Sequence, residues 1–231
     1  MSAADVAAAT GLSGARLRHH QRRKRDLLAL VVRHLPRGSR MLDVGCASGD
    51  IAVELGRMGY RVHGIDFEPQ RLERARQLAA RYGLDLVFTQ SSFDDLAPGD
   101  PFDGILLGEV LEHFSDPAAM LRKVGQLLKP GGRVILTTPN MPSLQNRLKF
   151  GLLGRFPDNN REHRYYFDDR RLREVVNQTP FQMVCFETRY TNLQTRFGWL
   201  TVLENVCLGW FWRLFRRSGD TIFTVLAKRE S

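Results

Sequence analysis

The sequence predicts an α/β fold built on a doubly wound, largely parallel sheet, and two observations carry the prediction. Residues 40–44 form a short apolar stretch, typical of a strand, that breaks into a glycine turn. Ile51, Val53, Leu55 and Met58 then follow a helical spacing. From there to about residue 140, apolar strands alternate with amphipathic helices. Such alternation is typical of parallel strands joined by helices.

The elements are expected in a definite order along the chain. A helix over 27–35 ends where Pro36 and Gly38 stop it. The expected strands then lie at 40–44, 61–66, 84–89, 103–107 and 133–138, and the expected helices at 50–58, 69–82 and 116–128. Beyond residue 140 the pattern predicts helices at 141–156 and 168–177 and strands at 181–190 and 221–228.

The composition is that of an ordinary globular protein: of 231 residues, 43% are hydrophobic and 26% are charged. The length predicts a single domain over residues 25–231, preceded by a flexible basic arm over residues 1–24. The three cysteines are widely spaced without a C-x-x-C pair, so neither a disulfide framework nor a cysteine zinc site is indicated. No signal-peptide pattern is present, and a reducing, cytoplasmic compartment is expected.

The formal net charge of +9 is partly concentrated near the end of the predicted arm. Six Lys and Arg residues and two histidines lie between Arg16 and Arg25. Such a run can meet the phosphates of nucleic acid or anionic lipid head groups. No aromatic residue is interleaved to stack on bases, which favours a solvated arm over a nucleic-acid contact.

The glycine turn predicts a ligand site. A strand, a glycine turn and a helix together present backbone N–H groups to a ligand at a helix N-terminus. Gly45 and Gly49 lack the Cβ atoms that would block its approach. A second expected strand ends in Asp66, 21 positions after Gly45, where a carboxylate can accept hydrogen bonds from ribose hydroxyls.

Four stretches, in matching order and spacing, resemble the class I S-adenosylmethionine-dependent methyltransferases. They are LDVGCASGDIA at 42–52, GIDFEP at 64–69, FDGILLGEVLEHFSDPAAMLRKVGQLLKPGG at 102–132 and RVILTTPN at 133–140. The resemblance implies a Rossmann-like, mostly parallel seven-stranded sheet with an antiparallel edge strand. It also implies S-adenosylmethionine, rather than a nicotinamide dinucleotide, as the cofactor.

The same resemblance assigns the cofactor contacts. The loop around Gly45 would hold the methionine portion, Asp66 the ribose and Phe67 the adenine. Two positions depart from the family: Ala47 replaces a middle glycine, and Ser92 stands where an acid usually meets the exocyclic amine. Asp94 or Asp95 could take the place of that acid, or either could begin a helix or turn. The full set expected to bind the cofactor is Asp43, Gly45, Cys46, Ala47, Gly49, Asp66, Phe67, Ser92, Phe93, Gly108 and Glu109.

Glu109, Glu112 and His113 form a second constellation, expected on a helix where positions i, i+3 and i+4 share one face. Two carboxylates and an imidazole suit a divalent cation. The spacing resembles two metal-using branches of the superfamily, the ubiquinone-biosynthesis O-methyltransferases and the small-RNA 3′-terminal 2′-O-methyltransferases. His163 is the candidate for a later histidine that the second branch adds.

Other relatives with this spacing use no metal. There the first residue touches the cofactor, and the histidine acts as a base or merely packs. His113 and His163 are the two histidines expected near the carboxyl ends of strands, and both are candidate catalytic residues. Metal binding, base catalysis and a structural role therefore all stay open for this constellation, since methyl transfer depends largely on positioning.

Residues 191–220 form a hydrophobic insert between two edge strands. Its apolar residues follow a helical spacing with added aromatic bulk at Trp210, Phe211 and Trp212. Too few apolar residues run together for a membrane-spanning helix. Two interpretations stay open: peripheral membrane contact through 197–217, and a lid or dimer contact.

The sequence thus predicts a methyltransferase that acts on oxygen in a small-molecule, lipid or lipid-linked glycan acceptor. One alternative is a metal-dependent RNA 3′-terminal 2′-O-methyltransferase, which the acids, histidines and positive charge favour. The hydrophobic insert and the absence of an RNA-binding module count against nucleic acid as a partner. Another is a non-catalytic methionine-biosynthesis accessory protein, which residues 138–156 resemble.

Overall fold

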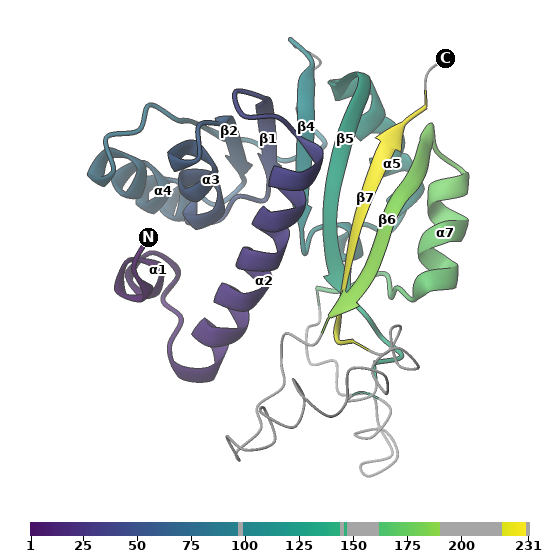
Figure 1. Ribbon diagram of the computed structural model, residues 1–231, viewed down its shortest axis with the longest axis horizontal. Coiled ribbons are helices and arrows are strands. Elements are labelled where there is room, and N and C mark those ends of the chain that lie inside the picture. Colours follow the sequence, from purple (N-terminus) through teal and green to yellow (C-terminus); the bar gives the residue numbers. More distant parts are fainter. Residues whose placement is uncertain (97–98, 144–145, 147–161, 190–218, 230–231) are drawn as a thin grey trace.

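The computed structural model shows a seven-stranded sheet with helices on both faces (Figure 1). It describes residues 1–96, 99–143, 146, 162–189 and 219–229. Within these ranges the strand order is β3-β2-β1-β4-β5-β7-β6. The order reverses between β1 and β4, and open α/β sheets bind ligands at such a switch point, outside the carboxyl ends of the strands.

Five strands run parallel to one another. They are β1 (Arg40–Val44), β2 (Arg61–Asp66), β3 (Val87–Gln90), β4 (Phe102–Gly108) and β5 (Leu128–Pro139). The start of β5 contains Pro130, Gly131 and Gly132, and the register with β4 shifts there, between Phe102 and Gly104.

The last two strands form the antiparallel side of the sheet. β7 (Thr221–Lys228) runs antiparallel to both β5 and β6 (Phe181–Arg189). β7 is buried along nearly all of its length, whereas β6 lies at the edge and is partly exposed. The prediction of a mostly parallel, seven-stranded, Rossmann-like sheet with an antiparallel edge is confirmed.

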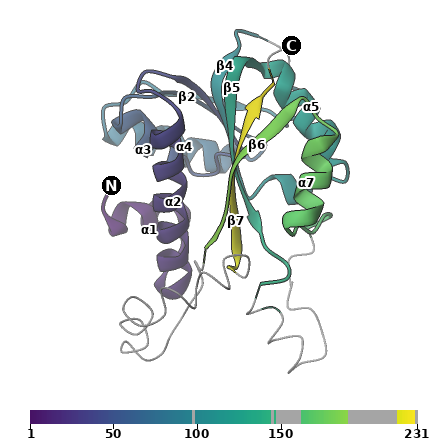
Figure 2. The ribbon, with the colours of Figure 1, turned by 45° about the vertical axis from the view of Figure 1, so that its right-hand side comes forward.

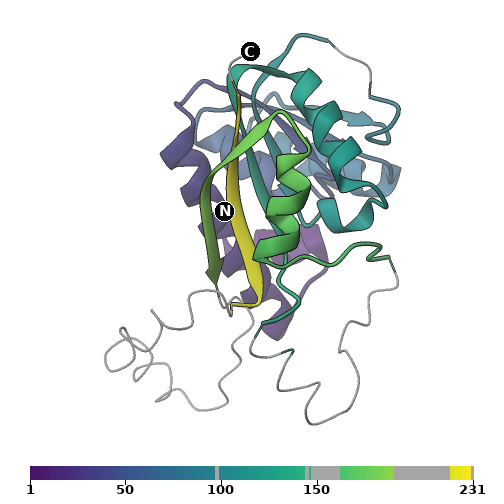
Figure 3. The same ribbon diagram turned by 90° about the vertical axis from the view of Figure 1, so that its right-hand side faces the viewer.

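Helices cover the two faces of the sheet (Figure 2). On one face lie α2 (Gly14–His34), α3 (Asp50–Arg57) and α4 (Pro69–Arg81). On the other lie α5 (Pro117–Leu127) and α7 (Asp169–Asn177), which face the viewer in Figure 3.

Each face of the sheet has its own hydrophobic core. Leu106 of β4 packs in the core with Leu30 and Phe223, whereas its neighbour Ile105 packs in the other with Leu121. This division follows from the strand geometry, since successive side chains of a strand point to opposite faces.

Residues 1–24, predicted as a flexible arm, instead form α1 and the first half of α2. α1 (Ala3–Thr10) begins with a capping box, in which Ser2 Oγ accepts from Asp5 N at 3.1 Å. Asp5 also accepts a hydrogen bond from the Tyr82 hydroxyl at 2.6 Å and lies 2.9 Å from Arg81, so α1 is attached to the end of α4. Val6 and Ala9 are buried as well, so both polar and apolar contacts hold α1 in place.

Two sequence expectations lie outside the described residues. Most of the helix expected at 141–156 and nearly all of the insert at 191–220 belong to this part of the chain. Among the described residues, no helix combines the length and the apolar character needed to span a membrane.

Candidate functional site

The glycine loop (residues 45–49) joins the carboxyl end of β1 to α3. Gly45, Ala47 and Gly49 all adopt left-handed backbone conformations, with φ of 67°, 48° and 73°. Glycine adopts this conformation without a steric penalty. The N–H of Cys46 donates to the carbonyl oxygen of Ile65 at 3.0 Å, which fixes the loop against β2.

The missing side chains of both glycines are needed for packing within the protein. A Cβ at Gly49 would lie 2.7 Å from Cβ of Ala75 on α4, and one at Gly45 would lie 3.1 Å from Cγ2 of Val110. The sequence alone suggested that these glycines make room for a ligand. The structure adds a second cause, because α4 and the segment after β4 approach the loop closely.

Asp66, the predicted ribose ligand, is buried and aligned by the backbone. One carboxylate oxygen accepts from the N–H of Ala47 at 2.9 Å, and the other accepts from the N–H of Glu68 at 2.9 Å. Each carboxylate oxygen has two lone pairs, so Asp66 keeps acceptor capacity toward ribose hydroxyls. Phe67, the next residue, has a 69% exposed side chain that is accessible to an adenine ring.

At the expected adenine end, Ser92 and Phe93 lie in different surroundings. Ser92 Oγ donates to a carboxylate oxygen of Asp95 at 2.7 Å and accepts from the N–H of Asp95 at 3.2 Å, so an acid does lie beside Ser92. Phe93, by contrast, is buried in the core, with its ring centroid 5.9 Å from that of Phe114. Phe93 therefore supports the site through its packing in the core.

Asp43 is buried in β1, directly before the glycine loop, and one of its carboxylate oxygens has no hydrogen-bond partner among the described residues. Burial raises the pKa of Asp43 to about 8, and the charges of Asp50 and Asp66 add to the effect. A positive charge brought near this carboxyl favours its ionised form.

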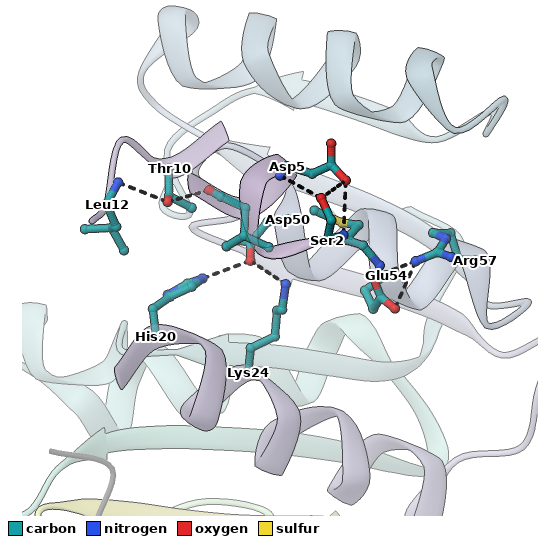
Figure 4. Close-up of polar contacts among 11 residues, drawn as sticks. Ser2, Asp5, Thr10, Leu12, His20, Lys24, Asp50, Glu54 and Arg57 are labelled. Carbon is teal, nitrogen blue, oxygen red and sulfur yellow. Dashed lines mark hydrogen bonds and ion pairs between the residues drawn. The ribbon is translucent and has the colours of Figure 1, made fainter. Parts of the chain in front are cut away.

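Asp50, the first residue of α3, connects the glycine loop to α2 (Figure 4). Its Oδ2 lies 2.8 Å from Nε2 of His20 and 3.1 Å from Nζ of Lys24. Burial raises the pKa of Asp50, but the hydrogen bond from His20 and the charges of His20 and Lys24 outweigh it, so the pKa lies below its usual value. The inner face of α2 therefore holds the helix that starts at the loop.

A second ion pair joins α2 to the end of β4. Nη1 of Arg23 lies 3.1 Å from Oε2 of Glu109, which has a left-handed backbone with φ 59°. The N–H of Glu109 donates to the carbonyl oxygen of Thr137 at 3.0 Å, next to Gly108 at the end of β4. α2 thus contacts the first residue of α3, which follows the glycine loop, and the residue that follows β4.

Glu109, Glu112 and His113 do not share a helical face. A single 3-10 turn (Leu111–His113) follows Glu109, so the expected i, i+3, i+4 geometry does not form. Among the described residues, the group able to hold a metal ion is Glu112, His113 and His163, whose ligand atoms all lie within 4.8 Å of one another. We call this group the carboxylate–histidine cluster. His163 takes the place expected of Glu109.

Backbone hydrogen bonds bring His163 to its place. The N–H groups of Arg164 and Tyr165 both donate to the carbonyl oxygen of Glu112, at 2.9 and 3.0 Å. His113 Nδ1 lies 3.2 Å from the carbonyl oxygen of Glu162, and the rings of His113 and His163 are 5.1 Å apart. The 162–165 segment is therefore tied to the turn that carries Glu112.

Glu112 is almost fully buried, and only one of its two carboxylate oxygens has a hydrogen-bond partner among the described residues. Its Oε2 accepts from Oγ1 of Thr138 at 3.0 Å, while Oε1 has no partner among the described residues. Burial and the nearby charge of Glu109 raise the pKa of Glu112. A buried carboxylate oxygen without a donor is costly. Together with the two imidazoles, this carboxylate suits a divalent cation.

Sequence reasoning missed the contacts of α2 with the site. His20, Arg23 and Lys24 have the spacing i, i+3, i+4, which places them on one helical face. That spacing was the available signal. The run carries no apolar periodicity, so the sequence pattern favoured a basic arm over a helix at these positions.

Comparison with known proteins finds methyltransferases. A family model described as a methyltransferase domain matches residues 16–185. A ubiquinone biosynthesis O-methyltransferase of Vibrio cholerae serotype O1 is 32% identical over 153 residues, which cover 63% of this chain and 62% of that protein. Its namesake from Xanthomonas euvesicatoria is 39% identical over 105 residues, or 45% and 44% of the two chains. The chain thus spans about half the length of the curated relatives it matches.

Solved structures share the fold at lower identity. Magnesium protoporphyrin IX methyltransferase from Synechocystis, with bound SAH, matches with a TM-score of 0.66 and 19% identity over 93% of this chain and 85% of that chain. The N-methyltransferase NodS from Bradyrhizobium japonicum, in complex with S-adenosyl-L-homocysteine, matches with a TM-score of 0.62 and 16% identity over 92% and 88%.

Proposed function

Since the chain belongs to the class I S-adenosylmethionine-dependent methyltransferases, we propose that it transfers the methyl group to an oxygen atom of a small-molecule, lipid or lipid-linked acceptor. The observation that carries the proposal is the carboxylate–histidine cluster, which follows the carboxyl end of β4. The curated relatives are named as O-methyltransferases of ubiquinone biosynthesis, which supports oxygen as the acceptor atom.

The donor half of the site consists of the glycine loop and Asp66. Its role is to orient the methyl group of the cofactor toward the acceptor. During transfer the carbon–sulfur bond breaks as the new carbon–oxygen bond forms, and the electron pair of the broken bond stays on sulfur. The sulfonium becomes a neutral thioether, and the acceptor hydroxyl must release its proton. Positioning supplies much of the rate in such reactions.

The carboxylate–histidine cluster would act on the acceptor oxygen. Glu112, His113 and His163 would hold a divalent cation, and such a cation, when bound, makes a coordinated hydroxyl more acidic. Thr138 orients Glu112 through its hydrogen bond. In the alternative, without metal, His113 or His163 takes the proton directly as a general base.

A chelator separates these two roles. If the cluster binds metal, turnover falls with chelator and returns with added Mn²⁺ or Mg²⁺, and Glu112→Gln reproduces the loss. If a histidine is the base, chelator has no effect and turnover falls on acidification. Glu174→Gln, on the exposed face of α7, is the matched control and should keep full turnover. Full activity in both His113→Ala and His163→Ala would reject both roles.

An RNA 3′-terminal 2′-O-methyltransferase is the second candidate, and the presence of His163 in the cluster is the observation in its favour. The acceptor is identified by incubating the purified protein with methyl-labelled S-adenosylmethionine and separate pools of hydroxylated aromatics, lipid extract and short single-stranded RNA. We expect label in one of the first two pools. Label in RNA alone would transfer the assignment to the second candidate. Cofactor binding without transfer to any pool would indicate a non-catalytic accessory protein.

A further inference from the structure

The outer face of α2 carries a row of residues that the proposed function does not use. Arg18, Arg22, Arg25, Ala29 and Val32 recur at alternating intervals of four and three positions, and all are exposed. Residues with this spacing lie on one face of a helix. We call this set the α2 outer row. The inner face of the helix is the one that contacts the glycine loop and β4.

The outer row keeps its positive charge. α2 contains seven Lys and Arg residues and a single acid, Asp26. That acid lies 3.0 Å from Nη1 of Arg189 and 3.6 Å from Nε of Arg25, so it is shared with a cation outside the row. Among the described residues, neither Arg18 nor Arg22 lies within ion-pair distance of a carboxylate. The first half of α2 is therefore a strongly cationic surface.

An apolar groove adjoins the charged part of the row. It has a volume of about 510 Å³. Its apolar lining comes from Met1, Leu28, Ala29, Val32 and Met58, and Gln21, Lys24 and Glu54 also line it. Arg25 also lines it, so the row and the groove share residues. The side chain of Val32 is 53% exposed. Cations and open apolar surface thus lie side by side.

The helix places this surface near the active-site edge. α2 starts at the end of the molecule where the parallel strands have their carboxyl ends, and it runs back toward the start of β1 (Figure 1). Arg18, Arg22 and Arg25 occupy the first half of the helix. A partner bound through them would lie close to the edge where the acceptor must enter.

We propose that the α2 outer row binds the anionic surface of a lipid bilayer, with its arginines on lipid phosphates and the adjoining groove against the apolar layer beneath them. Charge complementarity and the open groove support this partner. Nucleic acid is disfavoured because residues 1–34 contain no Phe, Tyr or Trp to stack on bases. The inference goes beyond the proposed function, and the surface is separate in sequence from the insert at 191–220.

Vesicle co-sedimentation of the full chain tests the proposal without any methyl acceptor. Two kinds of vesicle are compared at low and high salt: pure phosphatidylcholine, and phosphatidylcholine with roughly one third phosphatidylglycerol, an anionic lipid. We expect binding only to the anionic vesicles, lost at high salt. The triple variant Arg18→Gln, Arg22→Gln, Arg25→Gln should bind on the order of 100-fold more weakly, since each basic residue near an anionic surface contributes about a fivefold factor.

The matched control removes the same net charge elsewhere. Arg74→Gln, Arg170→Gln and Arg229→Gln together change exposed arginines of α4, α7 and the chain after β7. This variant should sediment like the unmodified protein, and circular dichroism should show that both triple variants are folded. Equal binding by the two variants would overturn the proposal. So would tighter binding to a single-stranded oligonucleotide than to anionic vesicles.

Discussion

The donor half and the acceptor half of the site are held in place by different parts of the chain. The backbone positions most of the donor half: left-handed residues shape the glycine loop, and backbone N–H groups align the carboxylate of Asp66. In the acceptor half, side chains from separate segments form the cluster: Thr138 donates to Glu112, and His163 comes from a segment some fifty positions away in sequence, which backbone hydrogen bonds tie to the carbonyl oxygen of Glu112.

This difference explains why one half is easier to predict than the other. A backbone-built loop requires particular residues at fixed spacing, because only glycine tolerates both the left-handed conformation and the close neighbours. A cluster of side chains requires only that suitable groups lie close together in the folded chain, so their spacing in the sequence is not fixed.

The largest effect is expected at Gly49. Gly49→Ala combines a left-handed conformation with a Cβ 2.7 Å from Ala75, whereas Gly83→Ala has a similar φ of 64° and no atom within 4 Å. Gly83→Ala should cost about 1 kcal/mol of stability from backbone strain alone. Gly49→Ala should cost clearly more and weaken S-adenosylhomocysteine binding at least about tenfold, because α4 and the loop must separate. Chemical denaturation and calorimetry measure both quantities; equal losses in the two variants would contradict the packing role.

A smaller effect is expected at the link between α2 and the loop. Lys24→Met leaves Asp50 buried with only His20 as partner and should lower the free energy of unfolding by about 2 kcal/mol, somewhat less than breaking an isolated buried pair. Arg22→Met, on the exposed face of the same helix, is the control and should change stability little. S-adenosylhomocysteine affinity should fall several-fold in Lys24→Met alone. Unchanged affinity would show that α2 does not support the donor half.

Asp43 should make stability depend on pH. Its folded-state pKa of about 8 lies above its unfolded value near 3.8, so between these pH values the folded state binds the additional proton. The free energy of unfolding should therefore fall as pH rises through this window. Asp43→Asn removes this dependence. From pH 5 to pH 8, the free energy of unfolding of the variant should therefore rise by on the order of 2 kcal/mol relative to that of the unmodified protein. Parallel denaturation curves at the two pH values would reject the assignment.

The sequence predicted the strands, most helices and the glycine loop because each has a local signal. Apolar periodicity marked the helices from α3 onward, and the offset of Asp66 from Gly45 marked the end of β2. The helix at 27–35 was predicted, but α1 and the first half of α2 were not. Ion pairs hold α2 at His20, Arg23 and Lys24, and hydrophobic patterns do not reveal such pairs. The capping box at Ser2 was a readable signal for α1 that the flexible-arm prediction did not use.

The constellation predicted from the sequence differs from the carboxylate–histidine cluster for a related reason. Glu112 and His113 were identified by their adjacency, and His163 was named as a later histidine. Glu109 was expected to join them on a regular helix, but a left-handed residue and a 3-10 turn direct it to Arg23 instead. Such a backbone irregularity has no signal in residue spacing, because glutamate rarely adopts positive φ.

Separation of the two halves is the central claim, and calorimetric titration of Glu112→Gln with S-adenosylhomocysteine tests it most directly. The substitution keeps the size of a buried side chain in the acceptor half and leaves the glycine loop and Asp66 unchanged. We expect the variant to bind S-adenosylhomocysteine as tightly as the unmodified protein, within about twofold, while methyl transfer is lost. A parallel loss of S-adenosylhomocysteine affinity in a folded variant would contradict the claim, because Glu112 would then belong to the donor half.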